Sequence, residues 1–430
     1  QMNRGWWAPR LGLTKSLDIQ GRLLELYGRL FDRGILKPLD RSLAASMADL
    51  SPGISELEVA EYVEHMVWRI DLIRERQGGA GLSGLDAYPQ PSGGVLAREE
   101  KNVSPDVATY FSRLYTAYLA WSATGKELTE ELMALQLWLD RLMNLKGSHL
   151  RWLVQWANSR ADLRPVLLAA FWGEGESGRG GVQVPPAYTV EGRQAIQDFV
   201  KAVGRAVKNT REFEKDADQF RHWYATQYFT AWRDFALRFN EGETLLGGPA
   251  MWRSTAVAMA SMNSPYLLLM DRMNEELKPA AKLAPSPVWA ERIKDFEKVL
   301  AMQGEGNQTS LVKKAGTGVE SAVRKAVGKV DPTEMARFKE AVQTHKEFQK
   351  YLKALAKMVP ATNAEEDAFR FASAHLPGGG KGGGDKSPFA EANAALIKID
   401  SLLQKKNSRG EDVFMDILRG PFEFLLYYIT

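Results

Sequence analysis

Apolar residues recur along this chain at spacings of three and four, and strand-like alternation is confined to isolated short runs. A period near 3.6 is that of one face of an α-helix. Leu17, Leu24, Tyr27 and Phe31 follow this period near the start of the chain. The pattern therefore predicts a mainly α protein, which we expect to be an elongated multi-helix bundle with Gly- and Pro-rich loops.

Capping residues and prolines mark where several helices begin. Ser55 and Glu58 form a capping-box pattern that predicts a helix from Glu56 to Arg76. Thr189 is the expected N-cap of another helix, and the pairs Ser264-Pro265 and Asp331-Pro332 each place a proline at a first helical position.

The longest uninterrupted helical pattern runs from Thr210 to Phe239, which spans about 45 Å if it is fully helical. Six aromatic residues follow this pattern at helical spacing: Trp223, Tyr224, Tyr228, Trp232, Phe235 and Phe239. Such a stripe favours a buried core face over a surface that binds a partner.

Stretches rich in Gly, Pro and polar residues divide the chain into regions. We expect an N-terminal helical region, a linker, a central helical region with a Gly-rich loop, a flexible linker and a C-terminal helical region. Their bounds are 1–85, 86–104, 105–303 with the loop at 173–187, 304–330 and 331–430. Within the central region, the helical patterns on the two sides of Gly125 predict an antiparallel hairpin.

Composition excludes several classes of function. Lys and Arg number 56 against 53 Asp and Glu, so the excess of 3 gives no strong field for nucleic acid. The absence of cysteine excludes disulfides, thiolate metal sites and cysteine nucleophiles. Every apolar run is shorter than the roughly 20 residues that span a bilayer. Since the chain opens on Gln1 without signal-peptide features and closes on LLYYIT, we expect it to be part of a longer protein.

The spacing of the glycines in FWGEGESGRGGVQVPPAYT resembles that of a phosphate-binding loop, but the residues around them argue against one. A P-loop needs Lys and then Ser or Thr after its second glycine, and this chain has Arg179 and Gly180 there. Glu174 and Glu176 add negative charge where an anion would bind. We therefore interpret the cluster as a flexible loop and expect no nucleotide or other cofactor.

No catalytic or metal-binding constellation emerges from the sequence. The five histidines, His65, His149, His222, His345 and His375, stand in no zinc-binding spacing, and no GxSxG elbow is present. His65 is expected to make a surface contact with Glu61, one helical turn earlier. A cell-wall glycosidase that uses Glu174 and Glu176 is the enzyme alternative, although a Gly-rich loop supplies no apolar pocket for either carboxyl.

Five short segments, in order along the chain, carry a family resemblance: PRLGLTKSLDIQGRLLELYGRLF, VPPAYTVEGR, QYFTAWRDFALRF, Ser264-Pro265 and RGPFEFLLYYI. They resemble the periplasmic helical region of the IcmF/TssM proteins, which are inner-membrane subunits of bacterial type VI secretion systems. The matching residues are Pro9, Gly12, Leu13, Tyr27, Pro185, Tyr188, Thr189, Gly192, Tyr228, Trp232, Phe235, Ser264, Pro265, Gly420 and Pro421.

The chain departs from the family pattern at four positions within or next to these segments. Pro186 replaces a glycine, Arg193 and Phe422 each replace a tryptophan, and Tyr266 replaces a leucine. The departures indicate a divergent member of the family.

The resemblance implies a structural, non-enzymatic segment of the type VI secretion membrane complex. It implies a periplasmic location, with the anchor to the inner membrane outside this chain. The implied partners are a TssJ-like outer-membrane lipoprotein, a TssL-like inner-membrane protein and further copies of the same subunit. A generic helical adaptor of another secretion machine is the other alternative.

Overall fold

The computed structural model describes residues 14–88, 90–91, 94–98, 105–121, 125–145, 150–173, 181–304, 332–375, 387–404 and 412–430. Helices make up almost all the regular structure of these residues, which confirms the predicted mainly α, multi-helix fold. Pro9, Gly12, Leu13, Glu174, Glu176 and nearly all of the predicted linker 304–330 lie outside the described residues.

The chain forms two compact units. Unit 1 contains Gln1–Leu163 and Glu191–Arg221, and unit 2 contains Arg164–Val190 and His222–Thr430. This division differs from the predicted regions, because residues of the predicted central region 105–303 contribute to both units. Hydrophobic periodicity shows which face of a helix is buried, but not which other helix covers it.

Unit 1 is organised around α3 (Glu56–Gln77), which packs against helices on several sides. Its other elements are α1 (Thr14–Phe31), the π-helical turn η2 (Asp32–Leu36), α2 (Lys37–Asp49), α4 (Leu82–Asp86), α5 (Gly94–Arg98), α6 (Pro105–Trp121), α7 (Gly125–Leu145) and α8 (Trp152–Ser159). It also contains all but the first residue of α10 (Val190–Ala206) and the first part of α11 (Thr210–Leu237).

The start of α3 confirms the predicted capping box. The Ser55 hydroxyl accepts from the Glu58 amide at 3.2 Å, and the Glu58 carboxylate accepts from the Ser55 amide at 3.1 Å. These bonds satisfy backbone donors that have no partner within the helix. Buried apolar side chains then occur nearly all round α3, which suits a helix at the centre of its unit.

The predicted hairpin across Gly125 is wrong in its packing. The main partner of α7 is α3, whereas α6 packs mainly on α1 and α4. The apolar stripe of α7, Leu128, Leu135, Leu139 and Leu142, is buried, with α3 as its main packing partner. Neighbouring helices in sequence therefore do not form a simple pair here.

Part of the predicted linker 86–104 is an ordered helix. Val95 and Leu96 of α5 are buried, and α5 packs against α3. Arg98 at the end of α5 forms ion pairs with Glu58 and Glu61 of α3. The turn-rich composition of this stretch did not predict this short helix, which is held in place by Val95, Leu96 and Arg98.

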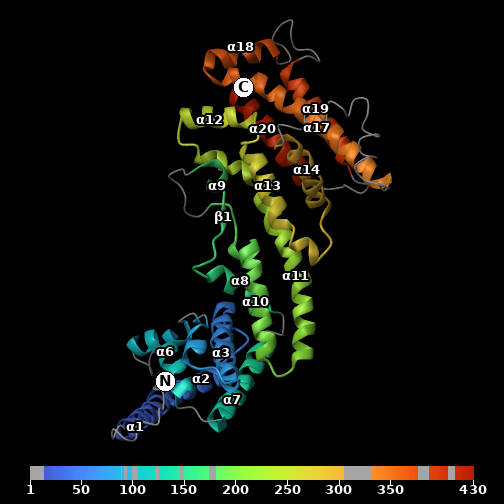
Figure 1. Cartoon of the computed structure of the whole chain (residues 1–430). Coiled ribbons are helices and arrows are strands. Elements are labelled where there is room, and N and C mark those ends of the chain that lie inside the picture. The colour runs from blue at the N-terminus through green and yellow to red at the C-terminus, as the bar shows by residue number, and fades with distance from the viewer. Residues whose placement is uncertain are drawn as a thin grey trace. The chain divides into compact units, whose positions relative to one another are not determined.

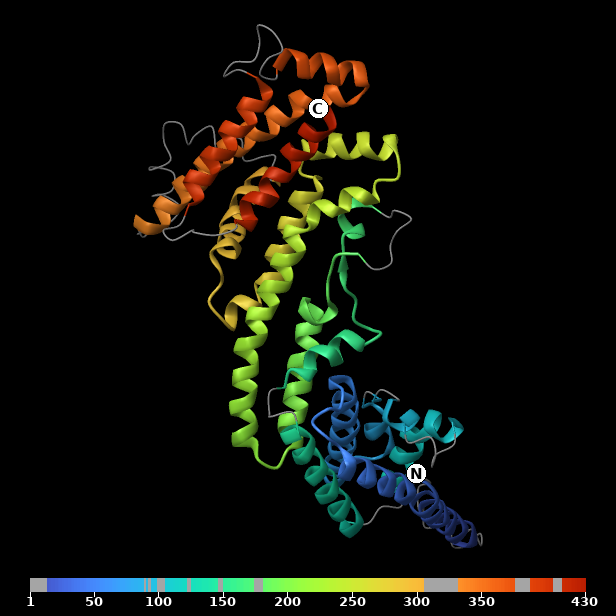
Figure 2. The same cartoon turned by 180° about the vertical axis from the view of Figure 1, so that it is seen from behind.

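Unit 2 is organised around α20 (Val413–Ile429), which contacts most of the other helices of this unit. The other elements are the second part of α11, from His222, together with β1 (Val166–Leu167), α9 (Ala169–Trp172), β2 (Gln183–Val184), η3 (Pro186–Tyr188), η4 (Phe239–Leu245), α12 (Pro249–Met259), α13 (Pro265–Leu277), η5 (Ala280–Lys282), α14 (Val288–Gly304), α17 (Pro332–Met358), η6 (Val359–Thr362), α18 (Glu365–His375) and α19 (Pro388–Leu403). In Figures 1 and 2, α17 and α19 run side by side.

The aromatic stripe of α11 is the main core face that the sequence predicted. Tyr224, Tyr228, Trp232 and Phe235 of α11 are buried, and so is Phe239, which the sequence placed on the same helix but which begins η4; Trp232 is 0% exposed. Trp223 is only partly buried. The single sheet among the described residues pairs β1 with β2 in antiparallel register, with Val166 opposite Val184.

Within the described ranges, no helix is both long enough and apolar enough to cross a membrane.

Candidate functional site

Residues from four of the five segments that carry the family resemblance meet in unit 2 at one buried cluster, which we call the motif junction. It comprises the turn from Pro185 to Thr189, the aromatic face of α11, the start of α13 and the middle of α20. Most of its members are buried: Pro186, Ala187, Thr189, Tyr224, Tyr228, Trp232, Phe235, Ser264, Pro265, Tyr266, Gly420 and Pro421. Segments more than 200 residues apart in the sequence therefore contribute to one packed core.

The Pro185–Thr189 turn is held by donors from α11. The Trp232 Nε1 group donates to the carbonyl oxygen of Tyr188 at 2.9 Å, and the Tyr224 hydroxyl donates to the carbonyl oxygen of Ala187. The carbonyls of Pro185 and Pro186 accept from the amides of Tyr188 and Thr189 within the turn, whereas those of Ala187 and Tyr188 accept from α11. The α11 aromatics supply these bonds as well as apolar area.

Aromatic rings complete the contact between the turn and α11. The ring of Tyr188 stacks on that of Tyr224 with centroids 5.8 Å apart, and it meets the ring of Tyr228 edge-on at 6.2 Å. Both arrangements suit the charge distribution of aromatic rings. The Thr189 hydroxyl donates to the carbonyl oxygen of Pro186 at 2.9 Å, and α10 begins at the next residue, as the sequence predicted.

Glu276 of α13 is a buried acid that the sequence reasoning missed. It is 2% exposed, and its carboxylate accepts from the Val190 amide at 2.7 Å and from the Tyr228 hydroxyl at 3.1 Å. Arg272 pairs with the same carboxylate at 2.5 Å. A carboxylate at the first amide of a helix is stabilised by the helix dipole, so Glu276 fixes the start of α10 to α11 and α13.

The start of α13 packs directly on α20. Ser264 and Pro265 place Tyr266 in the first turn of α13, where its ring meets the rings of Phe239 and Trp172 at centroid distances of 5.2 and 5.5 Å. A Cβ atom at Gly420 would overlap the Tyr266 ring. Gly420 is therefore needed for the close approach of the two helices, not for an unusual backbone conformation.

Replacing Gly420 with alanine is expected to destabilise unit 2 by about 1–3 kcal/mol, the usual cost of forcing an extra group into a packed core. The Tyr266 ring is buried and cannot swing away as a flexible side chain could. Urea unfolding of the full chain measures the effect.

The matched control is Gly21→Ala in α1, where a Cβ atom would meet nothing within 4 Å. There, alanine is expected to stabilise by up to about 1 kcal/mol through its higher helix propensity. Tyr266→Leu combined with Gly420→Ala should lose less stability than the two single changes added together. Equal midpoints for Gly420→Ala and the unchanged chain would rule out the close contact.

The other matching residues in the described range act locally. Tyr27 of α1 donates its hydroxyl to the carbonyl oxygen of Leu114 in α6 at 2.7 Å. Burial raises the pKa of Tyr27 to about 12, so the hydroxyl stays a donor at neutral pH. Gly192 is buried within α10 and belongs to unit 1, outside the motif junction.

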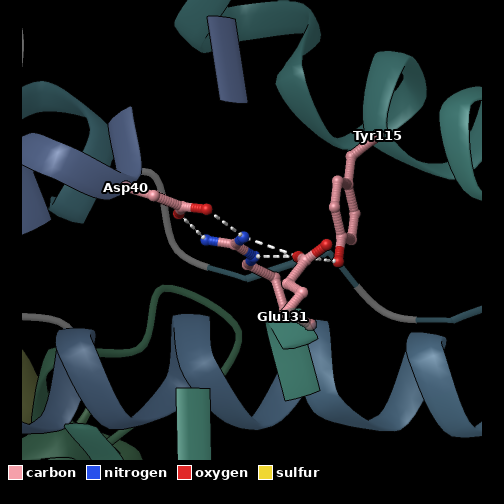
Figure 3. A network of polar contacts seen from close by, with 4 residues as sticks. Asp40, Tyr115 and Glu131 are labelled. Atoms are coloured by element: carbon pink, nitrogen blue, oxygen red, sulfur yellow. Dashed lines mark hydrogen bonds and ion pairs between the residues drawn. The ribbon is translucent and has the colours of Figure 1, made fainter. Parts of the chain in front are cut away.

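A buried charged network joins four helices of unit 1 (Figure 3). Arg69 of α3 is 0% exposed; its guanidinium binds both carboxylate oxygens of Asp40, at 2.6 and 3.1 Å, and Glu131 Oε1 at 2.6 Å. The Tyr115 hydroxyl donates to the same Glu131 oxygen at 2.5 Å. Figure 3 shows Asp40 on one side of the guanidinium and Glu131 with Tyr115 on the other.

Arg69 and Tyr115 each keep one charge state near neutral pH. Burial lowers the pKa of Arg69, but the Asp40 and Glu131 carboxylates outweigh it and raise the pKa above its ordinary value. Burial, with the Glu131 charge, raises the pKa of Tyr115 well above its usual range. The network joins α2, α3, α6 and α7.

Unit 2 contains a similar arrangement around Arg292 of α14. Its side chain is 1% exposed and pairs with Asp400 of α19 at 2.6 Å and with Asp412 just before α20. Its guanidinium also lies over the Phe414 ring, 4.7 Å from the centroid. Buried charges are normally paired in this way, and here the pairing joins three helices.

His65 corrects one expectation from the sequence. It is not a surface residue paired with Glu61: it is 1% exposed, and its ring lies 5.8 Å from that of Phe111 and 6.3 Å from that of Trp68. Glu61 pairs with Arg98 instead. Burial, with the nearby Arg69 charge, lowers the pKa of His65 to about 3.

The buried His65 makes unit 1 sensitive to acid. Its folded pKa of about 3 lies below the unfolded value near 6.5, so the unfolded chain binds the extra proton and stability falls as pH drops from 6.5 toward 3. At pH 5 the loss should reach about 2 kcal/mol, at about 1.4 kcal/mol per pH unit. Urea unfolding at pH 7 and pH 5 measures it.

His65→Met should reduce this pH dependence, whereas the exposed His222→Gln should leave it unchanged. The same pH dependence in His65→Met as in the unchanged chain would contradict the assignment.

No group of His, Cys, Asp or Glu in the described part of the chain is placed to hold a metal ion. His345 is buried, with Nδ1 3.2 Å from the carbonyl oxygen of Val299 and Nε2 2.9 Å from Gln349 Nε2. His149, Glu174 and Glu176 lie outside the described residues, so the glycosidase alternative stays a hypothesis.

Searches of protein-family models, curated proteins and solved structures found no match to this chain.

Proposed function

We propose that this chain is a structural, non-enzymatic segment of a TssM-like subunit in a type VI secretion membrane complex. In this role it lies in the periplasm and links an inner-membrane anchor, outside this chain, to a TssJ-like outer-membrane lipoprotein. Further copies of the subunit and a TssL-like inner-membrane protein are the other partners of the assembly.

The observation that carries the proposal is the motif junction. The resemblance rests on short segments that were chosen by sequence alone, and residues from four of these segments form mutual contacts. Trp232 donates to the Tyr188 carbonyl, and Tyr266, next to Ser264-Pro265, packs against Gly420. Short matches that arose by chance would not be expected to lie in one buried cluster. Their convergence therefore supports a fold shared with the IcmF/TssM proteins.

The buried charges favour a mechanical role. Arg69, Arg292 and Glu276 each join three or more segments through paired or hydrogen-bonded charges. Breaking such a contact leaves a buried charge unpaired, which costs about 3–5 kcal/mol. Helices held in this way resist sliding past one another, as a load-transmitting segment requires.

A genetic experiment tests the proposal. In the source bacterium, deletion of the gene that encodes this chain should abolish contact-dependent killing of competitor cells. The chromosomal change Gly420→Val should reduce killing strongly, because valine overfills the contact with Tyr266 more than alanine does. Gly21→Ala, which meets no neighbouring atom, is the control and should leave killing unchanged.

Unchanged killing after deletion, in a strain whose killing depends on its type VI apparatus, would reject the proposal. Fractionation of the same cells provides a second readout, in which the gene product should follow the inner membrane and be cleaved by protease added to spheroplasts. Protection from that protease would place the chain in the cytoplasm and would favour a different helical adaptor.

A further inference from the structure

One face of α1 exposes a stripe of large aliphatic side chains. Ile19, Leu23, Leu26 and Leu30 are 57%, 60%, 45% and 64% exposed. Their spacing of four, three and four residues is that of the contact positions of a coiled coil. The stripe spans three turns, about 16 Å.

The adjoining face of α1 is already packed against α6, so the helix itself is held in place. Phe31 is 2% exposed and its ring meets those of Phe111, Tyr115 and Tyr118 of α6. The Tyr27 hydroxyl adds the hydrogen bond to Leu114. The stripe is therefore a second apolar face on an anchored helix.

Three arginines line one flank of the stripe. Arg22, Arg29 and Arg33 each follow a stripe residue by three positions, which places them on the same side, and all three are exposed. Glu25 lies one helical turn from both Arg22 and Arg29, so the three arginines leave this flank with a net positive charge, and Asp32 pairs with Lys37 at 2.6 Å. The other flank is occupied by Tyr27 and by Trp121 of α6, whose rings meet edge-on at 5.8 Å.

We propose that this face of α1 binds an amphipathic helix of another protein that carries acidic residues beside its apolar stripe. The aliphatic stripe supplies contact area, and the arginine flank selects a partner with carboxylates opposite it. The inference is independent of the proposed secretion role.

A second copy of the chain fits this face poorly. Antiparallel pairing of two α1 helices would bring the arginine flanks together, and like charges across a helix interface are destabilising. Parallel pairing would bring each arginine flank against the flank that Tyr27 and α6 already occupy. The charge pattern thus favours an acidic partner over self-association.

Synthetic three-heptad peptides test the inference by fluorescence anisotropy with the full chain. Both peptides carry Leu at the a and d positions; one carries Glu at e and g, and the other carries Lys there, so that neither pairs with itself. The acidic peptide should bind with a Kd about tenfold lower than the basic peptide, or lower still, a difference of about 1.4 kcal/mol. Its affinity should fall as salt is added.

Substitutions at exposed positions test the aliphatic stripe and the arginine flank separately, without changing the core. Leu23→Gln with Leu26→Gln should weaken binding of the acidic peptide by about tenfold or more. Arg29→Glu with Arg33→Glu should reverse the preference toward the basic peptide. The matched control is Met133→Gln with Leu137→Gln on α7, where the side chains are 65% and 69% exposed, and it should not change the affinity.

Three results would overturn the inference. The first is equal or absent binding of the two peptides. The second is self-association of the full chain in light scattering that Leu23→Gln with Leu26→Gln abolishes, which would assign the face to a second copy. The third is binding to vesicles of phosphatidylglycerol and phosphatidylcholine that the same change abolishes, which would assign it to a membrane surface.

Discussion

Replacing Arg69 with methionine is expected to destabilise unit 1 by about 3–5 kcal/mol, the cost of leaving buried charges unpaired. Methionine keeps much of the volume of arginine but leaves Asp40 and Glu131 without their shared cation. Both carboxylates are mostly shielded, with side-chain exposures of 27% and 11%. Urea unfolding followed by circular dichroism measures the change.

The control for Arg69 is an ion pair of the same kind on the surface. Lys126 and Glu130 of α7 lie 3.8 Å apart with side chains 86% and 68% exposed, so Lys126→Met should change the stability by less than about 0.5 kcal/mol. Adding Asp40→Asn and Glu131→Gln to Arg69→Met should recover part of the loss, since neutral amides tolerate burial better than carboxylates. A loss for Arg69→Met no greater than that for Lys126→Met would refute a stabilising role for the buried charged network.

Trp232→Ala is expected to destabilise unit 2 by about 3–5 kcal/mol, the range for truncating a fully buried tryptophan. Trp232 is 0% exposed, and its ring meets that of Phe235 at 6.0 Å. The change also leaves the Tyr188 carbonyl without its donor. Chemical unfolding measures the loss, and near-ultraviolet circular dichroism reports whether the surrounding rings keep their packing.

Trp232→Phe separates the hydrogen bond from the packing. Phenylalanine keeps most of the apolar volume but cannot donate to the Tyr188 carbonyl. The loss of stability should therefore fall to about 1–3 kcal/mol, the cost of leaving one buried acceptor without a hydrogen-bond donor. If alanine and phenylalanine cost the same, the tryptophan would contribute only its hydrogen bond. If phenylalanine cost nothing, the bond to the Pro-rich turn would have no role in stability.

Features set by local chemistry could be predicted from the sequence. The capping box at Ser55 and Glu58, the proline starts at Pro265 and Pro332, and the buried face of α11 all depend on residues within a few turns of one another. Capping and helical amphipathicity are properties of short segments, so the pattern alone defines them.

Features set by distant contacts could not be predicted in this way. Arg69, Arg292 and Glu276 resemble ordinary solvated charges in the sequence, and their burial depends on acids or amides supplied by other elements. The one local signal is a charge between large apolar residues, as Arg69 is between Trp68 and Ile70 in HMVWRIDLI. Gly420 likewise gains its role only from the Tyr266 ring that is packed against it.

The packing partners of whole helices could not be predicted from the sequence either. The apolar stripe of α7 was visible in the sequence, but its partner α3 was not, because α6 offered a closer neighbour along the chain. The same reason explains why the predicted regions do not coincide with the two units, since α11 begins in one and ends in the other. Periodicity predicts which face of a helix is buried, but not which other element covers that face.

Affinity purification from membranes of the source organism tests the central claim most directly. The gene product would carry a tag, and the co-purifying proteins would be identified by mass spectrometry. The account predicts recovery of a TssJ-like lipoprotein and a TssL-like inner-membrane protein encoded beside it, with recovery reduced by Trp232→Ala and unchanged by Gly21→Ala. Recovery of neither protein, with the tagged product outside the membrane fraction, would contradict the account.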